Sequence, residues 1–197
     1  MVILPVTYLP QVAYFKAIIA GDYMIDTAEH YIKRSERNRA HIMTANGVMA
    51  LTVNIKRANR PCTPMREVEI DYSKRWQHQH WEAIRSAYKS SPYFDYYADM
   101  LEEFYLTEYK LLVEYNLAFI RLILRLLQQP IELKISDTYI TAAPTDIDLR
   151  IKGSTLPEAS FEPYVQVFAD RNPFVENLSI LDLLLCEGPN ALGYLLG

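Results

Sequence analysis

The strongest constraint on the fold is the dipeptide Asn46-Gly47, which separates two segments at residues 40–44 and 48–55. Asn-Gly supplies the positive φ angles of a type I′ turn, a tight connection between antiparallel strands. In the second segment large apolar residues occupy every other position, which is the pattern of a strand with one buried face. These residues are Met49, Leu51, Val53 and Ile55. The sequence therefore predicts a β-hairpin packed on a hydrophobic core.

The order of the other segments constrains the fold class. Short apolar runs begin the chain, residues 73–127 have a helical pattern, and further short apolar runs follow. Expected strands lie at 2–4, 23–25, 66–70, 131–135 and 165–168. Expected helices lie at 11–20, 73–89, 93–105 and 179–187, and residues 106–127 form either a further helix or a continuation of the one at 93–105. This order predicts an α/β fold, with one domain over residues 1–197, a mixed sheet with a β-hairpin, and a large helical insertion in the middle. An α+β arrangement is the alternative.

Charge and hydropathy exclude two classes of partner. The net charge of −4 gives no general attraction to nucleic acid, so no nucleic-acid partner is expected. The most apolar stretch, residues 111–127, contains four charged or polar residues, so no membrane span is expected. The two cysteines have neither disulfide-framework nor zinc spacing, which predicts a cytoplasmic protein. The chain has no glycine-rich phosphate loop and no nucleophile elbow, so the sequence does not identify a cofactor.

Residues 29–39 follow the second expected strand and contain four cations, two carboxylates, a histidine and a tyrosine. Ligands of α/β sheets gather at the carboxyl ends of strands, and guanidinium groups match the oxygens of phosphates and carboxylates. Lys33, Arg37 and Arg39 are therefore candidates for holding an anion, and Glu29 is a candidate base. A solvated charged loop is the alternative interpretation, and residue types alone favour it.

A run from Trp76 to Trp81 contains His78 and His80. Residues two apart on a helix do not share a face, so the spacing does not predict a metal site. His80 aligns with Trp76 and Ile84, which favours a packed histidine with a satisfied ring nitrogen. The alternative is a general acid or base that reaches a cleft.

Two features near residue 180 have structural explanations. Ser179 and Asp182 have the spacing of a capping box at the start of a helix. Cys186 has no base nearby in the sequence, so we expect a small buried side chain rather than a nucleophile.

An ordered set of short segments resembles the WbqC-like family of bacterial proteins, and the set spans nearly the whole chain. It comprises Tyr8-Leu9-Pro10, Tyr14-Phe15, Tyr31-x-Lys33, Arg37-Asn38-Arg39, Asn46-Gly47, Leu51-Thr52-Val53, Trp76, His80, Tyr88, Pro92-Tyr93-Phe94, Gln166-Val167-Phe168, Asn177-Leu178-Ser179-Ile180, Asp182-Leu183-Leu184 and Gly188. Many members of the family carry His-Gln-Pro before the Tyr-Leu-Pro and a proline after the Leu-Thr-Val. This chain has Leu4-Pro5-Val6-Thr7 and Asn54 at those places.

The resemblance implies a cytoplasmic bacterial protein, and some members lie in gene clusters for O-antigen and related surface polysaccharides. For such members it implies an acyl or aminoacyl (glycine) transferase that acts on an activated amino sugar. The expected ligand contacts, which would hold a nucleotide sugar or a phosphate-bearing donor, are Tyr8, Tyr31, Lys33, Arg37, Asn38 and Arg39. Glu29 would deprotonate the attacking amine, and His80 is a second candidate. The alternative is a non-catalytic ligand-binding or scaffold protein, and no expectation for the oligomeric state follows.

Overall fold

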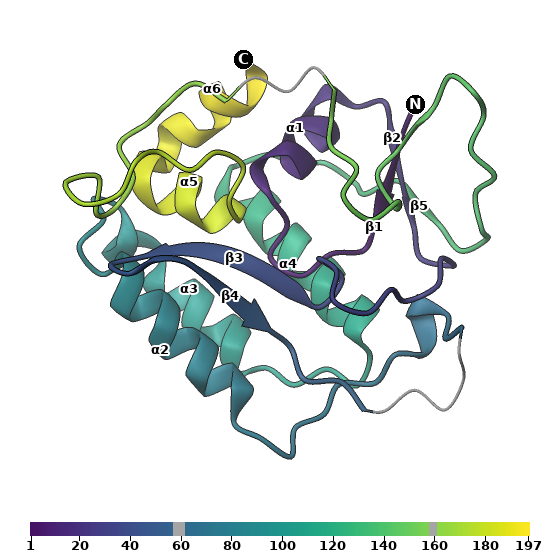
Figure 1. The fold of residues 1–197 in the computed structure, drawn as a ribbon, viewed down its shortest axis with the longest axis horizontal. Helices are drawn as coiled ribbons and strands as arrows, with labels where there is room; N and C mark the ends of the chain where they lie inside the picture. Colours follow the sequence, from purple (N-terminus) through teal and green to yellow (C-terminus); the bar gives the residue numbers. More distant parts are fainter. Residues whose placement is uncertain (57–61, 158–160) are drawn as a thin grey trace.

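A parallel sheet of four short strands is built around the N-terminal segment (Figure 1). Strands β1 (Val2–Pro5) and β2 (Tyr23–Asp26) form its centre, with β5 (Ile135–Ser136) beside β2 and β6 (Ile147–Asp148) beside β1. The computed structural model describes residues 1–56, 62–157 and 161–197. Because all four strands are parallel, their carboxyl ends lie at one edge of the sheet, which is where α/β proteins bind ligands.

Helix α1 (Val12–Ala20) connects the two central strands and lies beside them in Figure 1. Its apolar side chains are buried, and they include Phe15 and Ile18. Gly21 ends the helix with a φ angle of 86°, in the left-handed region that glycine enters without steric cost. The helix predicted at 11–20 and the strands predicted at 2–4 and 23–25 are confirmed.

The predicted hairpin is formed by β3 (Arg39–Thr44) and β4 (Gly47–Thr52), which pair only with each other. The predicted type I′ turn is wrong, because Gly47 has a positive φ angle whereas Asn46 does not. The Thr44 hydroxyl donates to the Gly47 carbonyl and accepts from the Asn46 N–H, so this side chain stabilises a different turn. Strand β3 also packs against helices α2 and α5, described below.

Three helices form the middle of the chain: α2 (Trp76–Tyr88), α3 (Phe94–Leu106) and α4 (Leu112–Leu126). They confirm the predicted helical insertion. Helix α4 is separate from α3 because the backbone is extended at Thr107 and again at Leu111, where Leu111 forms a β-bridge with Glu69. Within the described ranges, every helix is too short or too polar to cross a membrane. Together with the sheet and hairpin, these helices confirm the predicted α/β class.

Three of the expected strands are absent or shortened. Residues 66–70 overlap the 3₁₀ helix η1 (Met65–Glu67) and contain two residues that form isolated bridges, Glu69 and Ile70. Only the last residue of 131–135 joins β5. The strand predicted at 165–168 is wrong, because Phe168 has a φ angle of 62°. The Gln166 side chain bonds both main-chain groups of Val175, which closes a loop in place of a strand ladder.

The chain closes with helix α5 (Ile180–Glu187), the 3₁₀ helix η2 (Gly188–Asn190) and helix α6 (Ala191–Leu196). The Ser179 hydroxyl caps α5 by accepting from Leu181 N–H. Asp182 does not complete the predicted capping box, because the Ser179 N–H donates to the His41 carbonyl of β3. The Asp182 carboxylate is fully buried and accepts hydrogen bonds from Tyr88 (2.8 Å), Tyr164 (2.6 Å) and Gln166 (2.7 Å).

Candidate functional site

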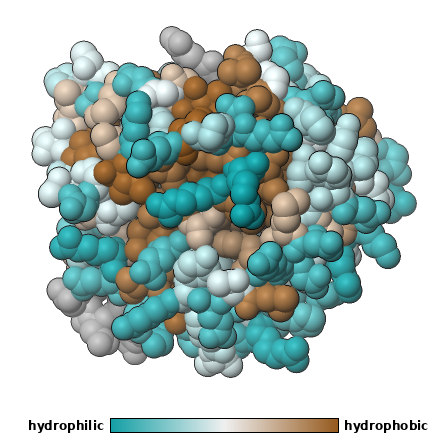
Figure 2. All heavy atoms as spheres, turned by 180° about the vertical axis from the view of Figure 1, so that it is seen from behind, coloured by the Kyte–Doolittle hydropathy of each residue, from teal (hydrophilic) through white to brown (hydrophobic). Residues whose placement is uncertain are grey.

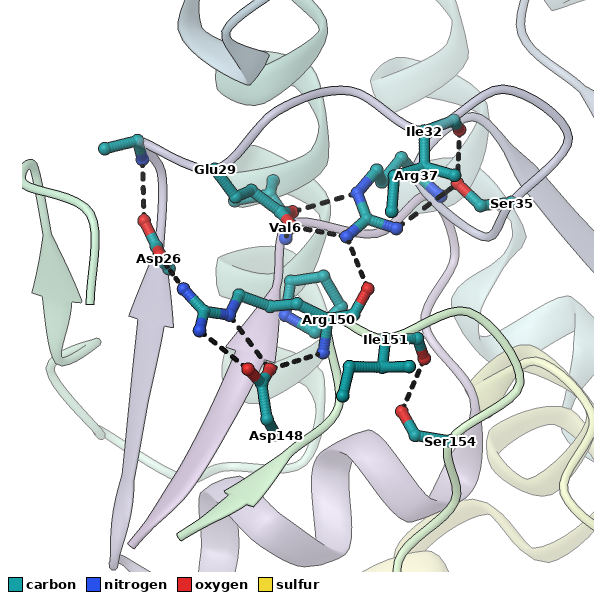
Figure 3. A network of polar contacts seen from close by, with 12 residues as sticks. Val6, Asp26, Glu29, Ile32, Ser35, Arg37, Asp148, Arg150, Ile151 and Ser154 are labelled. Carbon is teal, nitrogen blue, oxygen red and sulfur yellow. Dashed lines mark hydrogen bonds and ion pairs between the residues drawn. The ribbon is translucent and has the colours of Figure 1, made fainter. Parts of the chain in front are cut away.

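A buried ion pair lies at the carboxyl edge of the parallel sheet, just beyond β1 and β2 (Figure 3). Arg37 Nε donates to Glu29 Oε1 at 3.1 Å, and Arg37 Nη2 contacts the other carboxylate oxygen. The Val6 N–H adds a third bond to Glu29, and both charged residues are only 2% exposed. Burial raises the pKa of the Glu29 carboxyl, and the Arg37 guanidinium offsets part of that rise. The pair is therefore enclosed by protein rather than open to a ligand.

A second buried arginine joins this pair to the sheet. Arg150 contacts Asp26 at the end of β2 and bonds both carboxylate oxygens of Asp148, at 2.9 and 2.7 Å. Arg37 Nη2 donates to the Arg150 carbonyl at 2.9 Å, so the two arginines are linked (Figure 3). The Arg150 guanidinium lowers the pKa of Asp148. This network anchors the start of the loop 149–156.

A cavity of about 160 Å³ lies beside this network. Its walls come from segments 5–14, 36–41 and 149–156, and from Asn177. Arg39 enters from β3, where its Nε donates to Thr52 Oγ1 at 3.2 Å and no described residue accepts from its two terminal nitrogens. Lys152 lies in the loop wall and Glu36 adds one carboxylate. Because Glu29 neutralises Arg37, the remaining charges of the lining favour an anion.

Thr7 also lines the cavity and is 5% exposed. Its Oγ1 is buried within the wall and has no hydrogen-bond partner among the described residues.

The N-terminus of α1 also borders the cavity but offers it no free amide. The Val12, Ala13 and Tyr14 N–H groups donate to the Leu178 carbonyl, to Asn177 Oδ1 and to the Gln11 carbonyl. An anion in this cavity would therefore be held by side chains rather than by a helix terminus.

The predicted ligand contacts separate into three groups. Arg37, Arg39 and Tyr8 lie in the cavity wall, although the Tyr8 hydroxyl points to His80 and Tyr105. Tyr31 donates to Asn38 Oδ1 and the Asn38 amide donates to the Val53 carbonyl, so this pair holds the chain that enters β3. Lys33 is exposed and lies outside the cavity lining.

His80 lies in an aromatic cluster of the core. Its Nδ1 is 2.8 Å from the Tyr8 hydroxyl, which is 2.8 Å from the Tyr105 hydroxyl, and the ring is also bonded to the Thr52 backbone. Trp76 packs against the ring at 5.1 Å between centroids. Burial lowers the pKa of His80 to about 4, so the imidazole is neutral at neutral pH. The interpretation of His80 as a packed, satisfied histidine agrees with this placement.

Replacing His80 by glutamine is expected to make stability less dependent on pH. The unfolded chain takes up a proton at this residue near its ordinary value of about 6.5, whereas the folded protein does so near 4. The stability contributed by neutral His80 is therefore complete above about pH 6.5 and is lost towards pH 4, by at most roughly 3 kcal/mol. Urea unfolding of wild type and His80→Gln across this range measures the difference. His78→Gln, at an exposed position of the same helix, is the control, and an unchanged pH dependence in His80→Gln would contradict the assignment.

Sequence reasoning missed four residues at this site: Thr7, His41, Arg150 and Lys152. His41 could have been found, because it follows Arg39 by two residues on a predicted strand and so shares its face. Arg150 and Lys152 lie in a segment whose composition predicts only a loop, and the contact of Arg150 with Asp26 joins residues 124 positions apart. Within the described residues, no group of three or more His, Cys, Asp or Glu side chains is placed to hold a metal ion.

A second hollow lies between α3 and α4, at the back of Figure 1 and therefore on the face shown in Figure 2. That face carries apolar surface crossed by hydrophilic side chains. Phe104 and Leu117 contribute to the hollow, but so do four charged residues: Glu103, Glu114, Arg121 and Arg125. Two arginines and two glutamates balance in charge, so this hollow lacks the excess of positive charge of the first cavity.

Comparisons with known proteins point to one family. A model of the WbqC-like protein family matches residues 6–154, which include both buried arginines and most of the cavity wall. An uncharacterized protein of Mycobacterium tuberculosis, Rv1507c, is 33% identical over 102 residues, which is 51% of this chain and 44% of that protein. The aligned region thus spans less than half of that relative. No solved structure shows a significant match.

Proposed function

Because the chain belongs to the WbqC-like protein family, we propose that the cavity beside the Glu29–Arg37 pair binds a small anionic ligand. The ligand class is a phosphate-bearing metabolite such as a nucleotide sugar or an activated acyl donor. The proposed reaction is transfer of an acyl or aminoacyl group to the amine of an activated amino sugar, in the cytoplasm, during synthesis of a surface polysaccharide.

The observation that carries the proposal is the unbalanced positive charge of the cavity. Apart from the paired Arg37, the lining contains two cations, Arg39 and Lys152, and one carboxylate, Glu36. This local excess of positive charge contrasts with the net charge of −4 of the whole chain. Guanidinium and ammonium groups that lack protein partners are suited to phosphate oxygens.

The size of the cavity fits part of such a ligand. Sites that enclose a drug-sized molecule have volumes of about 300–1,000 Å³, whereas this cavity has about 160 Å³. In the proposal, the phosphate group enters the cavity and the rest of the ligand lies along the exposed loop that carries Lys152.

The predicted site residues take different roles in this proposal. Arg39 contacts the anion, whereas Arg37 and Glu29 hold the chain in place beneath it. Tyr31 and Asn38 fix the start of β3, which carries Arg39. A role for Glu29 as the base would require its bonds to Arg37 to open first. The enclosure of Glu29 and His80 therefore favours a second candidate, a protein of the same family that binds this ligand without catalysis.

Arg39→Ala is expected to weaken binding of UDP-N-acetylglucosamine by about ten- to a hundred-fold, because a charged hydrogen bond contributes about 1.5–3 kcal/mol. Isothermal titration calorimetry measures the affinity, and the ligand-induced rise in melting temperature gives a second readout. Lys33→Ala is the matched control, since this exposed cation of the same segment lies outside the cavity. The same titrations with UDP and with inorganic phosphate show whether the cavity binds the phosphate group alone or also the nucleoside and the sugar. Equal affinities of wild type and Arg39→Ala for all three probes would overturn the proposal.

A further inference from the structure

The imidazole of His41 is a polar group beside Arg39 that the described residues leave without a hydrogen bond. Residues at positions i and i+2 of a strand point to the same side, and Arg39 and His41 both line the cavity. The His41 main chain is fixed, because its carbonyl accepts from the Ser179 N–H at 3.0 Å. The ring is partly exposed, and no described residue forms a hydrogen bond with it. A fixed strand thus presents an uncommitted imidazole to the proposed anion.

The other two candidate proton carriers are committed to the protein. Glu29 bonds Arg37 and the Val6 N–H, and His80 bonds Tyr8 and the Thr52 backbone. Neither has a side-chain group left for a molecule in the cavity. His41 was not among the candidates that the sequence suggested, and the family resemblance does not mark it.

We propose that His41 contacts the bound anion in its protonated form and makes the site selective for a doubly charged phosphate or sulfate group. This inference rests on the proposed anion site and adds a proton-dependent contact to it. Arg39 holds one side of the anion, and the imidazolium N–H of His41 donates to another oxygen. Proton uptake and anion binding then reinforce each other.

Among the charged groups around the cavity, His41 is the histidine that faces the proposed anion. Arg39, Lys152 and Glu36 line the cavity, and side chains of these types keep their charge between about pH 6 and pH 8. Burial raises the pKa of Glu29 to about 7, so this carboxylate also changes charge in the same interval, but it bonds Arg37 and the Val6 N–H rather than the anion. Tyr14 donates its hydroxyl to the Pro5 carbonyl. On α5, Asp182 is enclosed by Tyr88, Tyr164 and Gln166, and on α2, His80 is enclosed as described above. Histidine is the side chain that ordinarily changes charge within that interval.

Sulfate is a suitable probe, because its two charges do not change between about pH 6 and pH 8. Calorimetry with the full chain is expected to show that wild type binds sulfate about ten-fold more weakly at the higher pH, the size of one charged hydrogen bond. His41→Gln is expected to lose most of this difference and to bind sulfate close to the weaker wild-type affinity at both pH values, with a small remainder from the protonation of Glu29. Arg39→Ala is expected to bind sulfate more weakly than wild type at both pH values. His30→Gln, at an exposed histidine outside the cavity, is expected to keep the wild-type pH dependence.

The outcomes separate this inference from the proposed function. If wild type binds sulfate equally at both pH values, or if His41→Gln keeps the wild-type pH dependence, the role of His41 is overturned and the anion site stands. If sulfate, phosphate and UDP-N-acetylglucosamine all fail to bind wild type, the proposed function falls and the role of His41 falls with it. Histidine ring signals in ¹H–¹⁵N NMR, recorded with and without sulfate, give a second readout. The His41 signal is expected to move and the His80 signal to stay, and the reverse would count against the inference.

Discussion

Arg37→Ala is expected to lower the free energy of unfolding by about 4 kcal/mol, because it leaves the Glu29 carboxylate buried without its charged partner. The variant also removes the donor to the Arg150 carbonyl, so the loop 149–156 loses one of its anchors. Urea unfolding followed by tryptophan fluorescence measures the loss, since Trp76 and Trp81 are both buried.

Arg85→Ala is the matched control for this prediction. Arg85 forms an ion pair with Glu82 on the surface of α2, where the two side chains are 52% and 41% exposed. Exposed pairs contribute little, so its loss is expected to change the free energy of unfolding by at most about 0.5 kcal/mol. If Arg37→Ala cost no more than Arg85→Ala, the buried pair would not be the structural anchor described above.

Asp182→Ala is expected to destabilise the protein by a similar amount, about 4 kcal/mol, because it leaves three buried donors without an acceptor. Tyr88 comes from α2, whereas Tyr164 and Gln166 come from the segment before α5. The carboxylate therefore holds the C-terminal segment against the helical middle of the chain. Denaturant unfolding measures the loss, and near-ultraviolet circular dichroism is expected to report altered tyrosine packing.

Two further variants test the cause of the Asp182 effect. Asp170→Ala removes a carboxylate that is 70% exposed and paired only with exposed Arg171, so a change within about 0.5 kcal/mol is expected. Asp182→Asn keeps one oxygen acceptor but presents amide hydrogens to donors, so an intermediate loss is expected. An Asp182→Asn variant as stable as wild type would show that the negative charge is not needed.

Local sequence signals predicted the elements that depend on near neighbours. Asn46-Gly47 predicted the hairpin, and Gly21 predicted the end of α1. The strand predicted at 165–168 failed because a side chain, Gln166, takes the main-chain partners that a neighbouring strand would have supplied. The turn type failed for a related reason, since the Thr44 hydroxyl stabilises a different geometry.

The candidate site was predicted in position but not in the roles of its residues. The charged run after β2 does lie at the carboxyl edge of the sheet. Composition could not separate Arg37, which is buried and paired with Glu29, from Arg39, whose terminal nitrogens have no acceptor among the described residues. The difference depends on Arg150 and Asp26, which are 124 residues apart in sequence and in contact in the fold. Strand periodicity could not have distinguished the two arginines, because residues 37 and 39 are two apart. They differ because β3 begins only at Arg39, whereas Arg37 lies before it and pairs with Glu29.

The strand order also determines when the site can exist during synthesis of the chain. Strands β1 and β2 can pair as soon as α1 has formed, because the residues that pair between these two strands are close in sequence. Strand β6 and the loop 149–156 are added to the same sheet only after the whole helical middle has been made. A nascent chain that has β1, β2 and β3 therefore has Arg39 but no enclosed cavity. The proposed anion would therefore bind only chains that have completed this part of the fold. Its binding would stabilise the complete molecule and leave partial chains unaffected.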